Sequence, residues 1–417
     1  MEHVNRKTKI DRLIHICTAV MISSFIIFDM DYRVSYILIV MTILIFGLVV
    51  MRNNFKIVVK IDSFHKYILI FALFAMCSSI WSYSPNLAIT KAVTILEILI
   101  CMSVLYMYYS RYNSLRDLYT VLIVSGFIVT IYSFYKYGIA NIFFVLGRGD
   151  RLEDIFSNVN SIAMIISVAI IAFVYKALFD KMGIFSAGIC ICLSMMGIVI
   201  IAATGSRKAL VMLVLGGFLL MSIRFKSKSF IVTALKVLII ILIMYFALSQ
   251  LRNVEMFKGI VERMDGLIAM VIGTGAVDVS TSVRAQFITA GIDQFKKHPI
   301  FGYGMGNSGK VLVDAIGGKE TYFHNNYVEL LVCGGIVGTV LYYMIWFKPI
   351  REILKYRKYD TNAILAIIMA AILLAMDYGV VTYFDKLNYF YIMIMYICAK
   401  NIRRKTDEGK ESLQKCC

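Results

Sequence analysis

Apolar runs recur along almost the whole chain, each broken by a short polar cluster. A helix needs about 20 apolar residues to cross roughly 30 Å of hydrocarbon, and only helices or closed barrels satisfy their backbone hydrogen bonds there. The pattern therefore predicts an all-α polytopic membrane protein in which residues 1–417 form a single integral-membrane domain. Twelve spans are expected: Leu13–Phe28, Val34–Met51, Tyr67–Trp81, Ala88–Tyr108, Leu118–Phe134, Asn160–Tyr175, Gly183–Thr204, Lys208–Ile223, Phe230–Ser249, Asn326–Phe347, Asn362–Val380 and Tyr383–Ala399.

The first apolar run follows the basic segment "NRKTKIDR", so a signal peptide is the alternative to a span. The residues after this run, "DMDYRVSY", contain no small-x-small cleavage site. We therefore expect it to be retained as the first span.

Lysine and arginine are concentrated in alternate connections between the predicted spans, and these connections hold more than half of the 43 basic residues. The positive-inside rule places these connections and both termini in the cytoplasm, including a basic tail at 401–417. The net charge of +17 then reflects loops that face anionic lipid, and nucleic acid is not an expected partner. The nine cysteines lie in spans or in the tail, which implies no disulfide framework.

One connection is large. Residues 250–325 form an extracytoplasmic loop between the ninth and tenth spans in this topology. Apolar residues at three- and four-residue steps predict an amphipathic helix over 254–271. A second helix is expected from the serines at 280–282 to Pro299, with an apolar face of Phe287, Ile288, Gly291, Ile292 and Phe295.

The loop continues with "GYGMGNSG", in which Gly304 to Gly309 matches the dinucleotide fingerprint G-x-G-x-x-G. No βαβ unit surrounds it, so we reject a dinucleotide cofactor. A glycine-rich turn that lets the backbone approach something closely is the simpler interpretation.

Several ionisable residues fall within or beside the apolar runs. Lys91 can extend its ammonium to the interface from a span end, whereas Glu97 and Asp377 lie inside spans. For these acids a functional role and an interhelical hydrogen bond or salt bridge both stay open. Arg207, at the outer membrane edge, is either an interfacial anchor or part of an anion site reached from outside.

His324, one of five histidines, stands at the mouth of the tenth span, beside Asn325 and Asn326, either of which can cap that helix. A histidine there can be a hydrogen-bonding structural residue or a catalytic one. Arg207, Arg284 and His324 together suggest a site, since two guanidiniums suit a diphosphate and an imidazole suits proton transfer from a hydroxyl. No Cys/His metal spacing is present, and no metal or cofactor is expected.

Three segments carry a family resemblance: "ATGSRKALV", "VRAQFITAGIDQFKKHPIFGYGMGN" and "FHNNYVELLVCGGIVGTVLYY". In this order they resemble the signatures of the O-antigen ligase and polysaccharide polymerase superfamily. "DIFSNVNSIAMI" is similar to the N-x-x-A element of that family, here Asn160 to Ala163. The resemblance covers the middle half of the chain.

The resemblance implies a membrane glycosyltransferase of the GT-C-like helical class in a bacterial cytoplasmic membrane. It implies an undecaprenyl-diphosphate-linked glycan as donor at the outer face, a glycan or lipid-linked glycan as acceptor, and inverting transfer without metal. Carried over by position, Arg207 and Arg284 bind the diphosphate and His324 orients or deprotonates the acceptor. Asn160, Gly304 and Asn325 are carried over as substrate-binding residues.

Among members of that family, we favour a polymerase of O-antigen, capsule or exopolysaccharide, working with a chain-length regulator and a flippase. A ligase that transfers glycan to lipid A core is the alternative. A flippase or transporter is the alternative of another class, but a central cytoplasmic loop between two six-span halves would suit it better.

Overall fold

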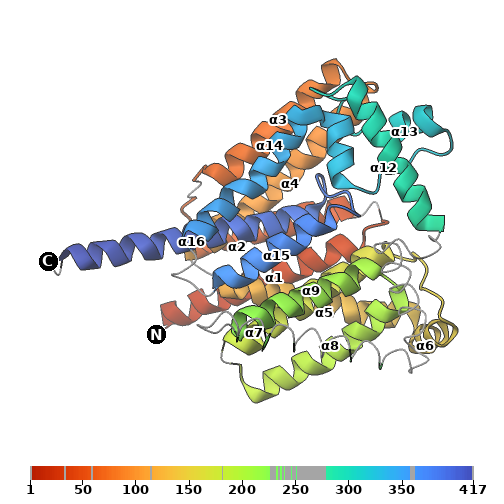
Figure 1. Cartoon of the computed structure of the whole chain (residues 1–417). Helices are drawn as coiled ribbons and strands as arrows, with labels where there is room; N and C mark the ends of the chain where they lie inside the picture. The colour runs from red at the N-terminus through yellow and green to blue at the C-terminus, as the bar shows by residue number, and fades with distance from the viewer. Residues whose placement is uncertain are drawn as a thin grey trace. The chain divides into compact units, whose positions relative to one another are not determined.

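Helices and their connecting loops make up the computed structural model, which describes residues 2–31, 34–57, 60–112, 115–180, 182–225, 279–356 and 362–415, with isolated positions between 226 and 278. Within these ranges the chain forms fourteen α-helices and no strand (Figure 1). The expected all-helical class is confirmed.

Eight segments in the described ranges are long and apolar enough to cross a membrane by length and composition. They lie in α1 (Glu2–Ile27), α2 (Val34–Arg52), α3 (Ser63–Cys77) with η1 (Ser78–Ile80), α4 (Pro85–Tyr112), α5 (Leu115–Tyr137), α7 (Val159–Phe179), α8 (Ile184–Thr204) and α14 (Asn326–Tyr356). This supports the polytopic membrane class, while the count of twelve spans, their orientation and the GT-C-like arrangement stay predictions.

Three further helices coincide with predicted spans: α9 (Arg207–Arg224), α15 (Asn362–Met376) and α16 (Lys386–Lys415). The second loop helix is also present, as α12 (Val279–Lys297). The predicted span Phe230–Ser249 and the amphipathic helix over 254–271 lie outside the continuously described ranges. Two short helices were not predicted, α6 (Ile139–Arg148) and α13 (Ser308–Ile316).

The chain divides into two compact units, each built from two separate stretches of sequence. The first comprises Met1–Leu44 and Arg116–Ala276, and the second comprises Ile45–Leu115 and Val277–Cys417. In the first unit α7 packs against both α8 and α9. Ser167 ties α7 to α9, since its hydroxyl donates to the carbonyl oxygen of Ala209 at 3.1 Å.

In the second unit α3 packs against α4 and α14, and α16 packs against α4, α14 and α15. Figure 1 shows α3, α4 and α14 running side by side, with α12 and α13 gathered at one end of α14. A buried cluster joins these two helices to the start of α14: Val311, Leu312, Phe323, Val328 and Val332. This cluster builds the part of the fold that carries His324.

Helix α14 is interrupted at Gly335, whose φ of 62° and ψ of −163° are not helical. At about 1.5 Å per residue, the break lies some 15 Å from the start of the helix. Irregular backbone at such depth in a membrane is tolerated only where protein covers it. The span predicted here is among the candidate spans, and the sequence pattern did not indicate a break within it.

A turn formed by residues 299–307, which we call the glycine turn, covers this break. The Ile336 and Val337 amides donate to the carbonyl oxygens of Pro299 and Ile300, at 2.8 and 3.2 Å. In return, the Tyr303 amide donates to the Val332 carbonyl oxygen at 2.9 Å. The backbone groups that the break releases are thereby paired, and the turn after α12 is fixed to the middle of α14.

Candidate active site

His324 occupies a left-handed backbone conformation, with φ of 55°. Such a conformation is uncommon outside glycine and costs on the order of 1–3 kcal/mol, so the surroundings must hold it in place. Two residues at the start of α14 do so, one just before the helix and one in its first turn. Asn325 caps the helix by accepting the Val328 amide at 3.1 Å, and the buried Glu329 carboxylate accepts the Phe323 amide at 3.1 Å.

The His324 ring lies between two aromatic residues. Its centroid is 4.0 Å from that of Tyr322 and 6.2 Å from that of Phe287, with which it is nearly parallel at 13°. Phe323 beside it is fully buried in the cluster described above, whereas His324 itself is half-buried. The backbone and the ring are therefore both held, while part of the imidazole stays accessible.

Helix α12 crosses the start of α14 at close range. A Cβ at Gly291 would lie 2.3 Å from the Val328 side chain, which explains the glycine. Phe287, Ile288 and Phe295 pack on the buried cluster as predicted. Ile292 does not: it is 42% exposed, so its place on the buried face was wrong.

Arg284 lies on α12, three residues before Phe287, and is half-buried. Residues three apart share a helix face, so Arg284 lies one turn from the aromatic ring that contacts His324. The structure thus places the predicted guanidinium and imidazole on neighbouring parts of one unit.

Gly304, predicted to contact substrate, has a structural explanation. Its φ is 90°, and a Cβ there would lie 2.4 Å from the Ser82 hydroxyl oxygen. Gly302 is equally constrained, since its Cβ would lie 2.5 Å from the Val332 carbonyl oxygen. The backbone of the glycine turn therefore makes a close approach, as the sequence suggests. It packs against the corner between α3 and α4 and against α14.

Two polar contacts reinforce the corner between α3 and α4. The Met305 amide donates to the Ser78 hydroxyl at 3.0 Å, and the Tyr83 hydroxyl donates to the Asp314 carboxylate at 2.5 Å. The hydrogen bond to Asp314 raises the pKa of the Tyr83 hydroxyl, because ionisation would remove the donated proton. Tyr83 thereby links this corner to α13.

Asp377 belongs to a buried hydrogen-bond network. Its carboxylate accepts from Thr382 at 2.6 Å, from Tyr343 at 2.9 Å and from Asn326 at 3.1 Å. The side-chain oxygen Oδ1 of Asn326 in turn accepts the Thr382 and Tyr383 backbone amides. Of the two roles left open for Asp377, the structure supports the interhelical hydrogen bond, which anchors the start of α14 to the α15–α16 connection.

Lys91 is more enclosed than a snorkelling residue needs to be. Its ammonium lies 3.4 Å from the centroid of the Phe384 ring and interacts electrostatically with Glu329. Its aliphatic stem also packs close to Gly306. This placement could not be predicted from the sequence, because nothing in the pattern around Lys91 relates it to the glycine turn.

The other two predicted site residues, Asn160 and Arg207, lie in the first unit. Arg207 opens α9 directly after Ser206, which caps that helix, and Gly205, which ends α8 with a φ of 60°. Asn160 lies in the first turn of α7, where both its backbone amide and its side-chain nitrogen donate to the side-chain oxygen Oδ1 of Asn158.

These two helix starts lie at the same end of the first unit. The Leu152 amide, just before α7, donates to the Ala203 carbonyl oxygen at the end of α8, at 2.9 Å. Both starts are capped by the protein: the Asp154 carboxylate accepts the Val159 amide at 2.8 Å, and the Ser206 hydroxyl accepts the Ala209 amide at 3.4 Å.

Chemically, the start of α14 combines an accessible imidazole with a cation on the adjacent helix. Glu329 is buried beneath and engaged with backbone, so it is not available as a competing base at the surface. Of these two groups, the His324 imidazole is therefore the one that a ligand at the surface can reach.

Residues 189–343 match the family described as O-antigen ligase. The matched segment contains Arg207, Arg284, Gly304, His324 and Asn325, whereas Asn160 precedes it. No curated protein matches the chain. The resemblance noted from the sequence is therefore confirmed over this segment, which supports a function of the O-antigen ligase or polymerase type in a membrane.

Proposed function

We propose that this chain polymerises lipid-diphosphate-linked oligosaccharide units into a surface polysaccharide at the outer face of the bacterial cytoplasmic membrane. The donor would be a glycan on undecaprenyl diphosphate, and the acceptor would be a hydroxyl of another lipid-linked unit. The proposal rests on the family match over 189–343. The observation that carries the catalytic assignment is the constrained, accessible His324 at the start of α14.

The proposed transfer forms one bond and breaks one. The acceptor hydroxyl oxygen bonds to the anomeric carbon of the donor sugar, while the bond from that carbon to the diphosphate oxygen breaks and the configuration inverts. The hydroxyl proton passes to the neutral His324 imidazole, and the leaving group departs as undecaprenyl diphosphate. General-base assistance of this kind is worth about 10²–10⁴ in rate.

Arg207 and Arg284 would stabilise the leaving group. A guanidinium presents its N–H donors in a planar fork that matches two phosphate oxygens, and its charge offsets the negative charge that develops on departure. The half-buried position of Arg284 beside the His324 region supports this role.

Purified protein with lipid-linked repeat units tests the proposal directly, with glycan length read on a gel. His324→Ala is expected to insert and fold normally yet leave single units unextended. His324→Gln separates two roles, because glutamine can orient a hydroxyl through a hydrogen bond but cannot take its proton. Residual extension by the Gln variant would indicate orientation, and its absence would indicate proton transfer.

The matched control is His298→Ala, which removes an exposed histidine from the same segment. It is expected to extend chains at the wild-type rate. If His324→Ala also extends chains at that rate, His324 is a structural residue and the catalytic assignment is wrong.

Ligation is the second candidate, because the matched family is described as O-antigen ligase. A ligase would transfer finished glycan to lipid A core. The same assay distinguishes the two when lipid A core is added: a polymerase lengthens lipid-linked glycan without it, whereas a ligase gives product only in its presence.

A further inference from the structure

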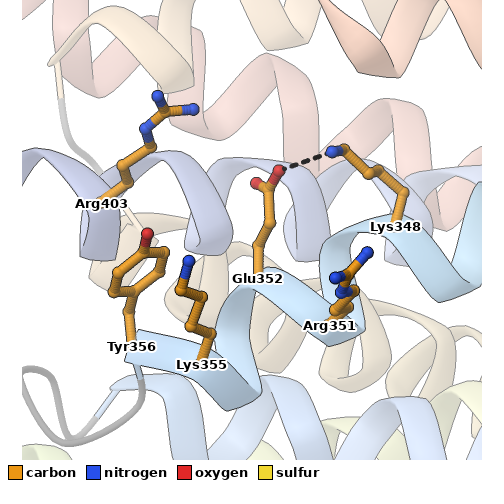
Figure 2. Close-up of a pocket in the computed structure, with 6 residues that line it drawn as sticks. All are labelled: Lys348, Arg351, Glu352, Lys355, Tyr356 and Arg403. Atoms are coloured by element: carbon orange, nitrogen blue, oxygen red, sulfur yellow. Dashed lines mark ion pairs between the residues drawn. The ribbon is translucent and has the colours of Figure 1, made fainter.

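A basic cavity of about 280 Å³ lies at the opposite end of α14 from His324. It is lined by Lys348, Arg351, Glu352, Lys355 and Tyr356 of α14 and by Arg403 of α16. Figure 2 shows these side chains around the space between the two helices. At ~30 Å³ per water, a cavity of this size can hold a phosphate group together with several waters.

Among the residues that the structure describes, those that line this cavity carry more positive than negative charge. Glu352 is the one acid in this described lining, and its carboxylate pairs with the Lys348 ammonium at 3.1 Å. Three further cations, Arg351, Lys355 and Arg403, line the same space. Their mutual repulsion favours an anion between them.

Two simpler explanations account for only part of this arrangement. The positive-inside rule explains why basic residues occur at this end, and the α14 dipole explains a cation in its last turn, such as Lys355. Neither explains why residues of two helices converge on one cavity, with Arg403 brought from the middle of α16.

We propose that this cavity binds a phosphate-bearing anion, supplied by the headgroup of an anionic phospholipid in the cytoplasmic leaflet. Two arginines give fork-shaped contacts to phosphate oxygens, and Lys355 adds a point charge. The lipid is the expected source because the cavity lies at the end of an apolar membrane helix, where acyl chains can lie along the helix while the headgroup enters the cavity. Basic pockets between membrane helices on this side are suited to such headgroups.

The test uses the detergent-solubilised full chain and follows its thermal unfolding as phosphatidylglycerol is added, with phosphatidylcholine as the zwitterionic comparison. We expect a saturable rise in Tm with phosphatidylglycerol alone. The double variant Arg351→Gln with Arg403→Gln should raise the lipid concentration for half-saturation by about 10-fold or more, since each lost charge-assisted contact weakens binding.

The control is Lys56→Gln with Lys66→Gln, which removes two exposed charges from the same expected membrane face that are not among the residues lining the cavity. It should bind as the wild type does. If the two double variants weaken binding equally, the effect is general surface electrostatics and the proposed site is wrong. A third arm adds inorganic phosphate: stabilisation by phosphate that depends on Arg351 and Arg403 and exceeds that by the lipid would overturn the lipid as source.

Discussion

At the scale of single residues, the strongest indication of a site is a histidine held where histidine is uncommon. The left-handed conformation of His324, with φ of 55°, is held by its neighbours. The side chains of Asn325 and Glu329 accept hydrogen bonds from backbone amides on either side of it. Strain that is held by specific partners commonly marks functional positions. The same geometry gives Asn325 a capping role, which accounts for this asparagine without a substrate contact.

Arg284 allows a sharp test of the proposed diphosphate contact. Arg284→Lys keeps the positive charge but loses the planar fork, so we expect it not to restore activity. Loss of one contact that strengthens in the transition state costs about 2–4 kcal/mol, which corresponds to roughly 30- to 1000-fold in rate. The rate of chain extension by purified protein measures this.

Lys296→Gln is the control for that variant, because it removes an exposed charge from the same helix, where Lys296 pairs with Asp293 at 2.8 Å. It should leave the rate unchanged. An Arg284→Lys variant that makes polymer at the wild-type rate would show that this residue needs only a charge, or that it serves α12 alone.

At the scale of elements, the break in α14 is the feature that positions the site. The glycine turn follows α12 directly and bonds to both sides of the break, so α12 cannot shift along α14 without breaking these hydrogen bonds. Arg284 lies on α12 and His324 lies two residues before α14, so the hydrogen bonds across the break help to hold the two segments that carry these residues together.

Gly335→Ala tests this coupling. The backbone conformation at Gly335 is one that only glycine adopts readily, costing on the order of 1–3 kcal/mol for alanine, and a Cβ would lie 2.3 Å from the Ile300 carbonyl oxygen. We expect a lower Tm together with a loss of chain extension, measured on purified protein.

Gly217→Ala is the matched control, since Gly217 lies inside α9 with open space where a Cβ would be. Alanine favours helix over glycine by roughly 0.5–1 kcal/mol, so this variant should keep or raise the Tm. If Gly335→Ala behaves like Gly217→Ala, the break is not needed to hold α12 against α14.

The sequence predicted most helices because a span is a long, local signal that apolar periodicity records directly. It missed the break at Gly335 because "CGG" in an apolar run is also what close helix packing produces. The partner that fills the break is a turn some 30 residues earlier, and nothing local relates the two. The contacts of Lys91 could not be predicted for the same reason, because its neighbours Phe384 and Glu329 are distant in sequence.

At the scale of the whole molecule, the predicted site residues fall into two units. Arg284, Gly304, His324 and Asn325 belong to the second unit, and Asn160 and Arg207 belong to the first. Sequence order alone could not show this, because each unit is assembled from two separate stretches. The matched segment spans both units and contains all three charged candidates, Arg207, Arg284 and His324.

The orientation of α14 decides whether the proposed function and the lipid site are physically possible. Loop charge predicts that Gly318, shortly before His324, is external and that Lys355, at the other end of α14, is cytoplasmic. A phosphatase that is active only outside the cytoplasm should therefore be active when it is fused after Gly318. A fluorescent protein that matures only in the cytoplasm should fluoresce when it is fused after Lys355. Both positions are needed, because one crossing separates them and opposite results exclude a failed fusion.

The reverse pattern would place His324 in the cytoplasm, away from the externally displayed lipid-linked glycan. It would also place the basic cavity outside, so one measurement would contradict both proposals.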